Sequence, residues 1–261
     1  MWTTFRHAEP VMGTVVSFDV RHEAGDQHAA AARAAVAAGC GMLHEADEVF
    51  SLWKPDTVAS RLRRGALTVR ECPPEVGEVL QRCADARQRT EGWFDPWAAP
   101  GGLDLTGLVK GWAAQRACDA IRSAGLPAAM VNAGGDIACY GGPEPGHAWM
   151  VGIQDPQHPG KVIRVLEIAG GAVATSGTYE RGDHVYDPFT GRAVLPTLQS
   201  ATVVTSDLGL ADAMATALFA AGEGGLSFVT AVDGASGYVV RTDGSRRAAG
   251  PLPVVGGRPA Q

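Results

Sequence analysis

The stretch that decides the fold is DLTGLVKG (Asp104–Gly111), which continues as an amphipathic helix and leads to VNAGGD (Val131–Asp136). A short strand enters a glycine-flanked turn, and a helix then begins with a lysine in its first turn. A second strand ends on a double glycine followed by an acid. Helix N-termini and glycine turns offer free backbone N–H groups to anions. The stretch therefore predicts a site for a phosphate-bearing ligand.

The composition is that of an ordinary globular protein. The chain has 261 residues, of which 46% are hydrophobic and 19% charged, and its formal net charge is −6. This length is enough for one large domain or two small lobes with a substantial core. The acidic balance and the lack of a long basic run argue against a nucleic-acid-binding surface, which needs a stripe of lysine and arginine.

The N-terminus and the cysteines bear on the compartment. The stretch MWTTFRHAEPVMGT (1–14) lacks the apolar core of a signal peptide, and no segment has the length and apolarity to span a bilayer. The five cysteines are scattered without a CxxC pair, which is typical of thiols in a reducing compartment. A complete chain is therefore expected to be cytoplasmic and to have no membrane partner, although a trimmed chain would look the same.

Hydrophobic periodicity predicts helices and strands in mixed order. The predicted helices cover 26–50, 75–91, 107–124, 208–221 and, more briefly, 226–232. The predicted strands cover 15–20, 103–105, 128–132, 137–140, 149–153, 162–168, 172–176, 201–205 and 238–241. Because these elements follow no strict βαβ rhythm, the expected fold class is α+β. The Pro/Gly-rich end, 251–261, is expected to be a loose tail.

Two glycine motifs are candidates for ligand contacts. Lys110 lies in the first helical turn, where a cation opposes the helix dipole, so a bound phosphate or a nearby carboxylate would explain it. Asp104 ends the predicted strand, and Gly107 permits close approach. In NAGGD, Asn132 and Asp136 would point toward a nucleotide. Taken alone, each motif fits a capped helix with a surface lysine or a plain hairpin turn better, since short glycine motifs are common.

Two further motifs carry groups suited to catalysis. In VATSGTYERGDHVYDPFTGR (173–192), Thr175 ends a strand and His184 is a candidate general base, although a lone histidine in a polar loop is usually just a solvated one. In LADAMATAL (210–218), Asp212 and Thr216 share one helix face. An aspartate in an apolar helix is costly unless it is paired, capped or metal-bound. A carboxylate, a hydroxyl and backbone carbonyls suit Mg²⁺, while an aspartate satisfied by backbone is as good an explanation of this motif alone.

The co-occurrence of these motifs is more specific than any one of them. An anion-binding helix start, a glycine turn, a possible base and a possible Mg²⁺ site together indicate a metal-assisted reaction at a diphosphate.

In the same order along the chain, seven blocks resemble the ApbE-type flavin transferase family (FAD:protein FMN transferases). They are VMGTVVSFDV, FSLWKPDTVASRL, GWFDPWAAPGG, DLTGLVKGWAAQRACDAI, VNAGGDIACYG, VATSGTYERGDHVYDPFTGR and ATVVTSDLGLADAMATALFAAG. The resemblance implies a single α+β domain over 1–261 made of two closely packed lobes, with FAD in the cleft between them. It also implies Mg²⁺-dependent transfer of FMN from FAD to a threonine or serine hydroxyl of a target protein, with release of AMP.

The resemblance also assigns roles to residues of this chain. His184 would be the base, and Mg²⁺ would be held by Asp212, Thr216 and the backbone carbonyl of Gly107. The residues expected to contact FAD or shape its site are Met12, Trp53, Asp104, Lys110, Asn132, Asp136 and Thr175.

The chain departs from the family pattern in one block. Only WAAPGG (Trp97–Gly102) separates the FDP and DLTG blocks, where many members carry a longer insertion with an aromatic FAD contact, so Trp97 is a candidate replacement. Two alternative functions stay open: a Mg²⁺-dependent FAD pyrophosphatase that produces FMN and AMP, and a non-catalytic flavin-binding protein.

Overall fold

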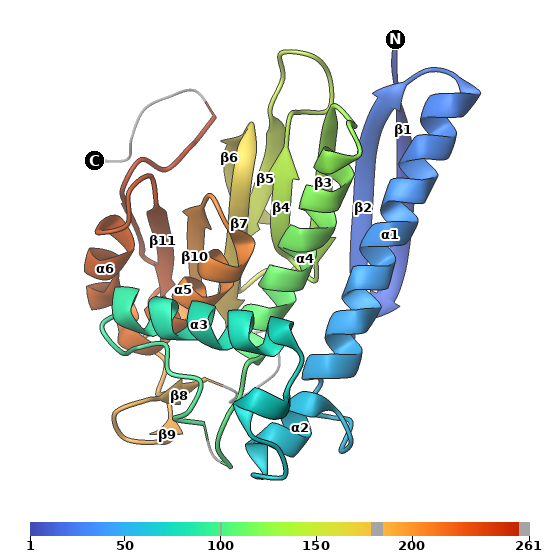
Figure 1. Ribbon diagram of the computed structural model, residues 1–261. Helices are drawn as coiled ribbons and strands as arrows, with labels where there is room; N and C mark the ends of the chain where they lie inside the picture. The colour runs from blue at the N-terminus through green and yellow to red at the C-terminus, as the bar shows by residue number, and fades with distance from the viewer. Residues whose placement is uncertain (100, 179–184, 256–261) are drawn as a thin grey trace.

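An antiparallel sheet forms the centre of the molecule (Figure 1). The computed structural model describes residues 1–99, 101–178 and 185–255, and within them the sheet has eight strands in the order β1-β2-β3-β4-β7-β10-β11-β12. The strands are β1 (Trp2–Val11), β2 (Thr14–Glu23), β3 (Ala128–Ala133), β4 (Asp136–Tyr140), β7 (Gly170–Gly177), β10 (Leu198–Thr205), β11 (Ser236–Arg241) and β12 (Arg246–Ala249).

Helices cover one face of this sheet (Figure 1). Helices α1 (Asp26–Phe50), α4 (Thr106–Ser123), α5 (Leu208–Ala221) and α6 (Leu226–Thr230) lie against the sheet. Helix α3 (Pro74–Arg89) packs on α4 and α5, and the short α2 (Val58–Arg63) packs against α1. Helix α4 contributes the fully buried Trp112, Leu108 and Ile121 to the main core. Helix α5 is apolar almost all round, which is the pattern of a helix enclosed by protein on every side.

A two-stranded hairpin covers part of the opposite face. Its strands, β5 (Trp149–Gln154) and β6 (Val162–Ile168), pair with each other and not with the sheet. Trp149, Val151 and Leu166 form a second apolar cluster with sheet residues such as Tyr238. Since β4 is therefore buried on both faces, the middle of the sheet is the most enclosed part of the fold.

Helices α4 and α5 cross at Gly111. A Cβ atom placed on Gly111 would lie 2.5 Å from the carbonyl oxygen of Leu208 and 3.0 Å from Cβ of Asp212. Only glycine lets the two backbones come this close.

Gly111→Ala is expected to destabilise the fold by about 2–3 kcal/mol, because α4 must move away from α5. The matched control is Gly77→Ala in α3, where an added Cβ meets nothing within 4 Å and should gain roughly 0.5–1 kcal/mol. Urea unfolding of both variants measures the two changes, and equal stabilities would contradict the close crossing.

The structure confirms the predicted α+β class, and it differs from the sequence prediction at 103–105. These residues form no strand, because they lie in the loop that leads into α4 while Leu103 and Leu105 are buried. Short buried loops imitate strands in hydrophobicity alone. The division into two lobes stays a prediction. Within the described ranges, none of the helices combines the length and the apolarity needed to cross a membrane.

Candidate active site

A cavity of about 380 Å³ opens at the end of the sheet where α1 ends and α4 begins, toward α2 and the small strands β8 (Tyr186–Asp187) and β9 (Arg192–Ala193) in Figure 1. Segments far apart in the sequence build its wall. They are the β1–β2 turn, the end of α1, the loop after α3, the start of α4, the β3–β4 turn and two side chains of α5. Six predicted contacts meet here: Met12, Trp53, Asp104, Lys110, Asp212 and Thr216, with Gly107 beside them.

The start of α4 is fixed by Asp104. Its carboxylate Oδ1 accepts hydrogen bonds from the backbone N–H of Thr106 at 2.9 Å and from the Thr106 hydroxyl at 2.6 Å. An aspartate that accepts from the residue two positions on is a common way to begin a helix. Asp104 therefore orients the helix start at the cavity wall.

Lys110, the fifth residue of α4, has carboxylate partners that explain a cation near the start of a helix. Its ammonium pairs with Oδ2 of Asp136 and lies 3.7 Å from Oδ2 of Asp212. Asp136 is 1% exposed, and its Oδ1 accepts a hydrogen bond from the backbone N–H of Thr175 at 3.0 Å. The carboxylate explanation of Lys110 is thus confirmed, and the lysine still reaches the cavity.

Asp212 is the most enclosed acid of the cavity. It is 5% exposed on α5 and accepts a hydrogen bond from the backbone N–H of Gly111 at 3.2 Å. Burial raises the pKa of Asp212 above its ordinary value, while Lys110 and the Gly111 N–H oppose that rise. A buried carboxylate with one hydrogen-bond donor and a cation 3.7 Å away is incompletely compensated, and a bound cation would stabilise its charge.

Oxygen atoms gather beside Asp212. The hydroxyl of Thr216 lies one helical turn further on and 3.4 Å from the hydroxyl of Ser176. Gly107 approaches the same point, since a Cβ built on it would lie 3.4 Å from Oγ1 of Thr216. One carboxylate, two hydroxyls and a nearby backbone form a hard-oxygen set that fits Mg²⁺. Ser176 is a member that the sequence reasoning passed over.

Two turns meet at the cavity. Met12 (φ 53°) and Gly13 (φ 67°) form the two-residue turn between β1 and β2, with the positive angles of a type I′ hairpin. A Cβ on Gly134 would lie 2.6 Å from Oγ1 of Thr14. The contact between the two turns therefore requires glycine at 134, and the positive φ of 109° favours glycine at 135. The hairpin interpretation thus accounts for the double glycine without a ligand.

Aromatic side chains line the cavity opening. Trp53 is 85% exposed beside it. Trp93 also lines the cavity and packs edge-on against Phe189, with ring centroids 4.9 Å apart. Trp93 and Tyr186 were missed by the sequence reasoning, although the aromatic density of GWFDPW was a usable signal. Trp97 is 49% exposed, while its neighbours Pro96 and Ala98 line the wall.

Asn132 and Thr175, two predicted site residues of the described part of the chain, do not line this cavity. Asn132 alternates with the core residues Val131 and Ala133 and lines a separate hollow with Met130 on the other face of the sheet. Its Oδ1 accepts from the N–H of Gly135 at 2.8 Å, so it shapes the turn. The Thr175 hydroxyl is hydrogen-bonded to the Thr202 hydroxyl at 2.8 Å. His184 lies outside the described residues.

Comparison with known proteins identifies the family. A model of the ApbE family matches residues 12–101 and 99–239. The chain belongs to the ApbE family. Two curated relatives bear the name FAD:protein FMN transferase. The protein of Vibrio cholerae is 32% identical over 130 residues, which is 46% of this chain and 39% of the relative. That of Rhodobacter capsulatus is 38% identical over 131 residues, 46% of this chain and 24% of the relative.

Solved structures show the ApbE fold over almost the whole chain. The flavin transferase ApbE from Vibrio cholerae superposes with a TM-score of 0.81 at 21% identity, covering 95% of this chain and 97% of that one. The ApbE protein from Thermotoga maritima superposes with a TM-score of 0.82 at 23% identity, covering 94% and 96%. The sequence alignments span less than two fifths of the two curated relatives' own length.

Proposed function

We propose that this ApbE family member is an FAD:protein FMN transferase, which moves FMN from FAD to a threonine or serine hydroxyl of a target protein and releases AMP. The observation that carries the proposal is the meeting of Lys110, Asp212 and Thr216 in one cavity with an exposed tryptophan at its opening. Cationic and hard-oxygen groups suit a diphosphate, and an indole suits a flavin or adenine ring. The names of the relatives support this reaction.

The reaction joins the target hydroxyl oxygen to the FMN-side phosphorus of FAD, and the bond from that phosphorus to the bridging oxygen breaks, so that AMP leaves. The hydroxyl proton passes to a base, a role that we assign to His184. Because the enzyme forms no covalent intermediate in this scheme, the side chains act by positioning and by neutralising charge. Lys110 would hold a diphosphate oxygen, and its pairing with Asp136 fixes the direction from which it does so.

Asp212, Thr216 and the Gly107 carbonyl are the groups that we propose to hold Mg²⁺, with Ser176 at hydrogen-bond distance from Thr216. A bound Mg²⁺ supplies Lewis-acid stabilisation of the negative charge on the diphosphate. The fit rests on the buried, donor-poor carboxylate of Asp212 and on the oxygen character of its neighbours.

Trp53→Ala is expected to weaken FAD binding about tenfold, since stacking a ring on an aromatic side chain is worth roughly 1–3 kcal/mol. The melting temperature should stay within about 1 °C of wild type, because an exposed side chain contributes little to folding. Titration of FAD fluorescence measures the affinity. Met150→Ala, at an exposed side chain of β5 that does not line the cavity, is the matched control with unchanged affinity. An equal loss in both variants would contradict the assignment of Trp53.

The decisive experiment incubates the full chain with FAD, Mg²⁺ and candidate acceptor domains that expose threonine and serine. Mass spectrometry of the acceptor should show an added FMN, together with free AMP. Free FMN and AMP without acceptor labelling would instead indicate the pyrophosphatase. FAD retained without AMP release would indicate a flavin-binding protein.

The proposed partners are FAD and the protein acceptor, and the proposed compartment is the cytoplasm. All five cysteines of the chain are free thiols in the structure. This state supports a reducing compartment.

A further inference from the structure

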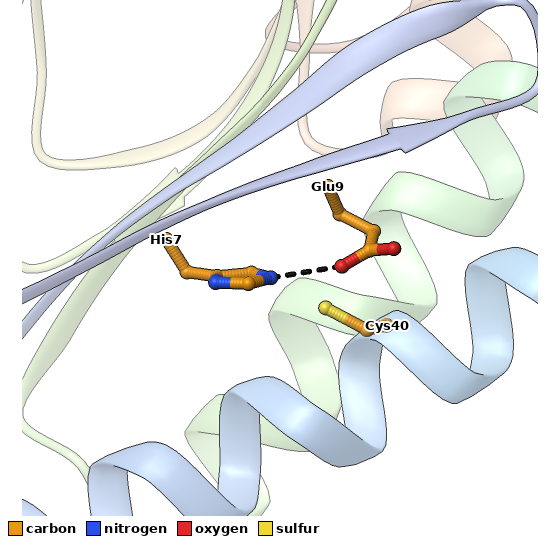
Figure 2. Close-up of side chains that lie close together, drawn as sticks. All are labelled: His7, Glu9 and Cys40. Atoms are coloured by element: carbon orange, nitrogen blue, oxygen red, sulfur yellow. Dashed lines mark hydrogen bonds and ion pairs between the residues drawn. The ribbon is translucent and has the colours of Figure 1, made fainter.

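A cluster of metal-binding side chains lies between β1 and α1, outside the proposed flavin site. His7, Glu9 and Cys40 present one ligand atom each, and these three atoms lie within 4.8 Å of one another. Figure 2 shows the imidazole, the carboxylate and the thiol pointing toward one another across the gap between strand and helix. Nε2 of His7 lies 2.9 Å from Oε2 of Glu9.

The secondary structure brings these groups together. His7 and Glu9 are two positions apart on the edge strand β1, so both side chains leave the same face. Their neighbours on that face, Phe5 and Val11, pack into the core under the helices. On α1, Cys40 and His44 are four positions apart and also share a face. Nε2 of His44 lies 2.8 Å from Oε1 of Glu9, so the carboxylate is contacted from both elements.

We propose that His7, Glu9 and Cys40 bind a zinc ion, with His44 orienting the Glu9 carboxylate. Imidazole nitrogen, carboxylate oxygen and thiolate sulfur are all zinc ligands, and three protein ligands leave a position for water. Ligand atoms around a tetrahedral zinc ion lie about 3.3–3.7 Å apart for bond lengths of about 2.0–2.3 Å. The observed spacing therefore requires side-chain movements of only about 1 Å. A hydrogen bond to the ligating carboxylate is the usual support for such a site.

The Glu9 carboxylate is the centre of the cluster. His7 and His44 each contact one of its oxygens, and the Cys40 thiol is hydrogen-bonded to the same carboxylate. Among the described residues, one other histidine pairs with a carboxylate: Nδ1 of His158 lies 3.1 Å from Oδ2 of Asp155, and no cysteine is part of that pair. It offers no third ligand and serves as the control.

The cluster adjoins the flavin cavity on both of its elements. Met12 follows Glu9 by three residues, and Asp47 follows His44 by one helical turn, and both line the cavity. Zinc binding would therefore fix the edge strand to α1 one turn away from the cavity wall.

The test uses the full chain, Co²⁺ as a spectroscopic probe and Zn²⁺ as its competitor. One equivalent of Co²⁺ should produce a sulfur-to-cobalt charge-transfer absorption in the near ultraviolet, and one equivalent of Zn²⁺ should abolish it. Cys40→Ser and His7→Ala should remove the band. His44→Ala should weaken Co²⁺ affinity about 10–100-fold, as loss of a supporting hydrogen bond does.

Matched controls keep the result independent of folding and of the proposed Mg²⁺ site. Cys72→Ser, His158→Ala and Asp212→Asn should retain the band, and circular dichroism should show that every variant is folded. Glu9→Gln is the second variant if Cys40→Ser does not fold, and it should reduce the affinity as well. Wild-type chain without the band, or a band that persists in Cys40→Ser and His7→Ala, would overturn the zinc assignment and leave the flavin proposal untouched.

Discussion

Replacing Asp212 with asparagine is expected to lower FMN transfer by roughly 100-fold or more. Each tenfold loss in rate corresponds to about 1.4 kcal/mol, and metal stabilisation of transition-state charge is worth several kcal/mol. Asparagine keeps the shape and can still accept from the backbone N–H of Gly111, the hydrogen bond that spans 3.2 Å in the structure. The change therefore removes the negative charge with little effect on packing. Steady-state transfer to an acceptor domain, measured across Mg²⁺ concentrations, provides the number.

The control for this experiment is Asp207→Asn. Asp207 precedes α5, where its Oδ1 accepts from the N–H of Leu210 at 2.8 Å and its Oδ2 from Arg82 at 3.2 Å. Asp207 is the N-cap of the helix that carries Asp212, and it lies outside the proposed metal site. The transfer rate of Asp207→Asn should therefore stay within about twofold of wild type, and its stability should change by about 1 kcal/mol or less. Full turnover by Asp212→Asn would remove Asp212 from the proposed metal site, and equal inactivity of both variants would indicate general damage to α5.

The sequence predicted most helices because their pattern is local. The structure has α1 at 26–50 and α5 at 208–221, the predicted ranges. Both helices are long, and the periodicity of a long apolar stripe outweighs errors at single positions. Thr57 caps the start of α2, where its side chain accepts from the N–H of Ser60.

Strand β1 escaped prediction for a physical reason. It is an edge strand with Arg6, Glu9 and Pro10 among its residues, and charges and proline are typical of edges because they discourage pairing with other chains. A scan for apolar alternation does not find such a strand. The metal-binding cluster was missed with it, since His7 and Glu9 meet Cys40 only through tertiary packing.

At the candidate site, the sequence did not reveal in which direction each side chain points. Sequence neighbours were predicted to act together, yet Asn132 and Asp136 do not line the same space. Asn132 faces the far side of the sheet, and Asp136 points to Lys110. Which face a strand residue occupies depends on register, and a shift of one position reverses it. Asp212 and Thr216 met as predicted because a helix fixes its faces without tertiary information.

The second large effect is expected from Lys110→Met, which leaves Asp136 buried without its cation. Lys110 is 29% exposed at the side chain and Asp136 only 2%, and removing one partner of a buried pair costs about 3 kcal/mol. For a chain of this size, that loss lowers the melting temperature by roughly 8 °C. Lys54→Met is the matched control. Nζ of Lys54 lies 2.5 Å from Oδ2 of Asp47, and the Lys54 side chain is half exposed. This ion pair should therefore contribute less than about 1 kcal/mol to stability.

A double-mutant cycle separates the ion pair from the role of the lysine toward FAD. Asp136→Asn keeps an acceptor for the N–H of Thr175, which lies 3.0 Å from the carboxylate, and removes the charge. Combined with Lys110→Met, it should recover part of the lost stability, because the buried charge is gone. Transfer should not recover, since the cation that we assign to the diphosphate is still missing. Additive losses of stability would show that the two side chains do not interact, and recovery of transfer together with stability would mean that Lys110 acts on the fold alone.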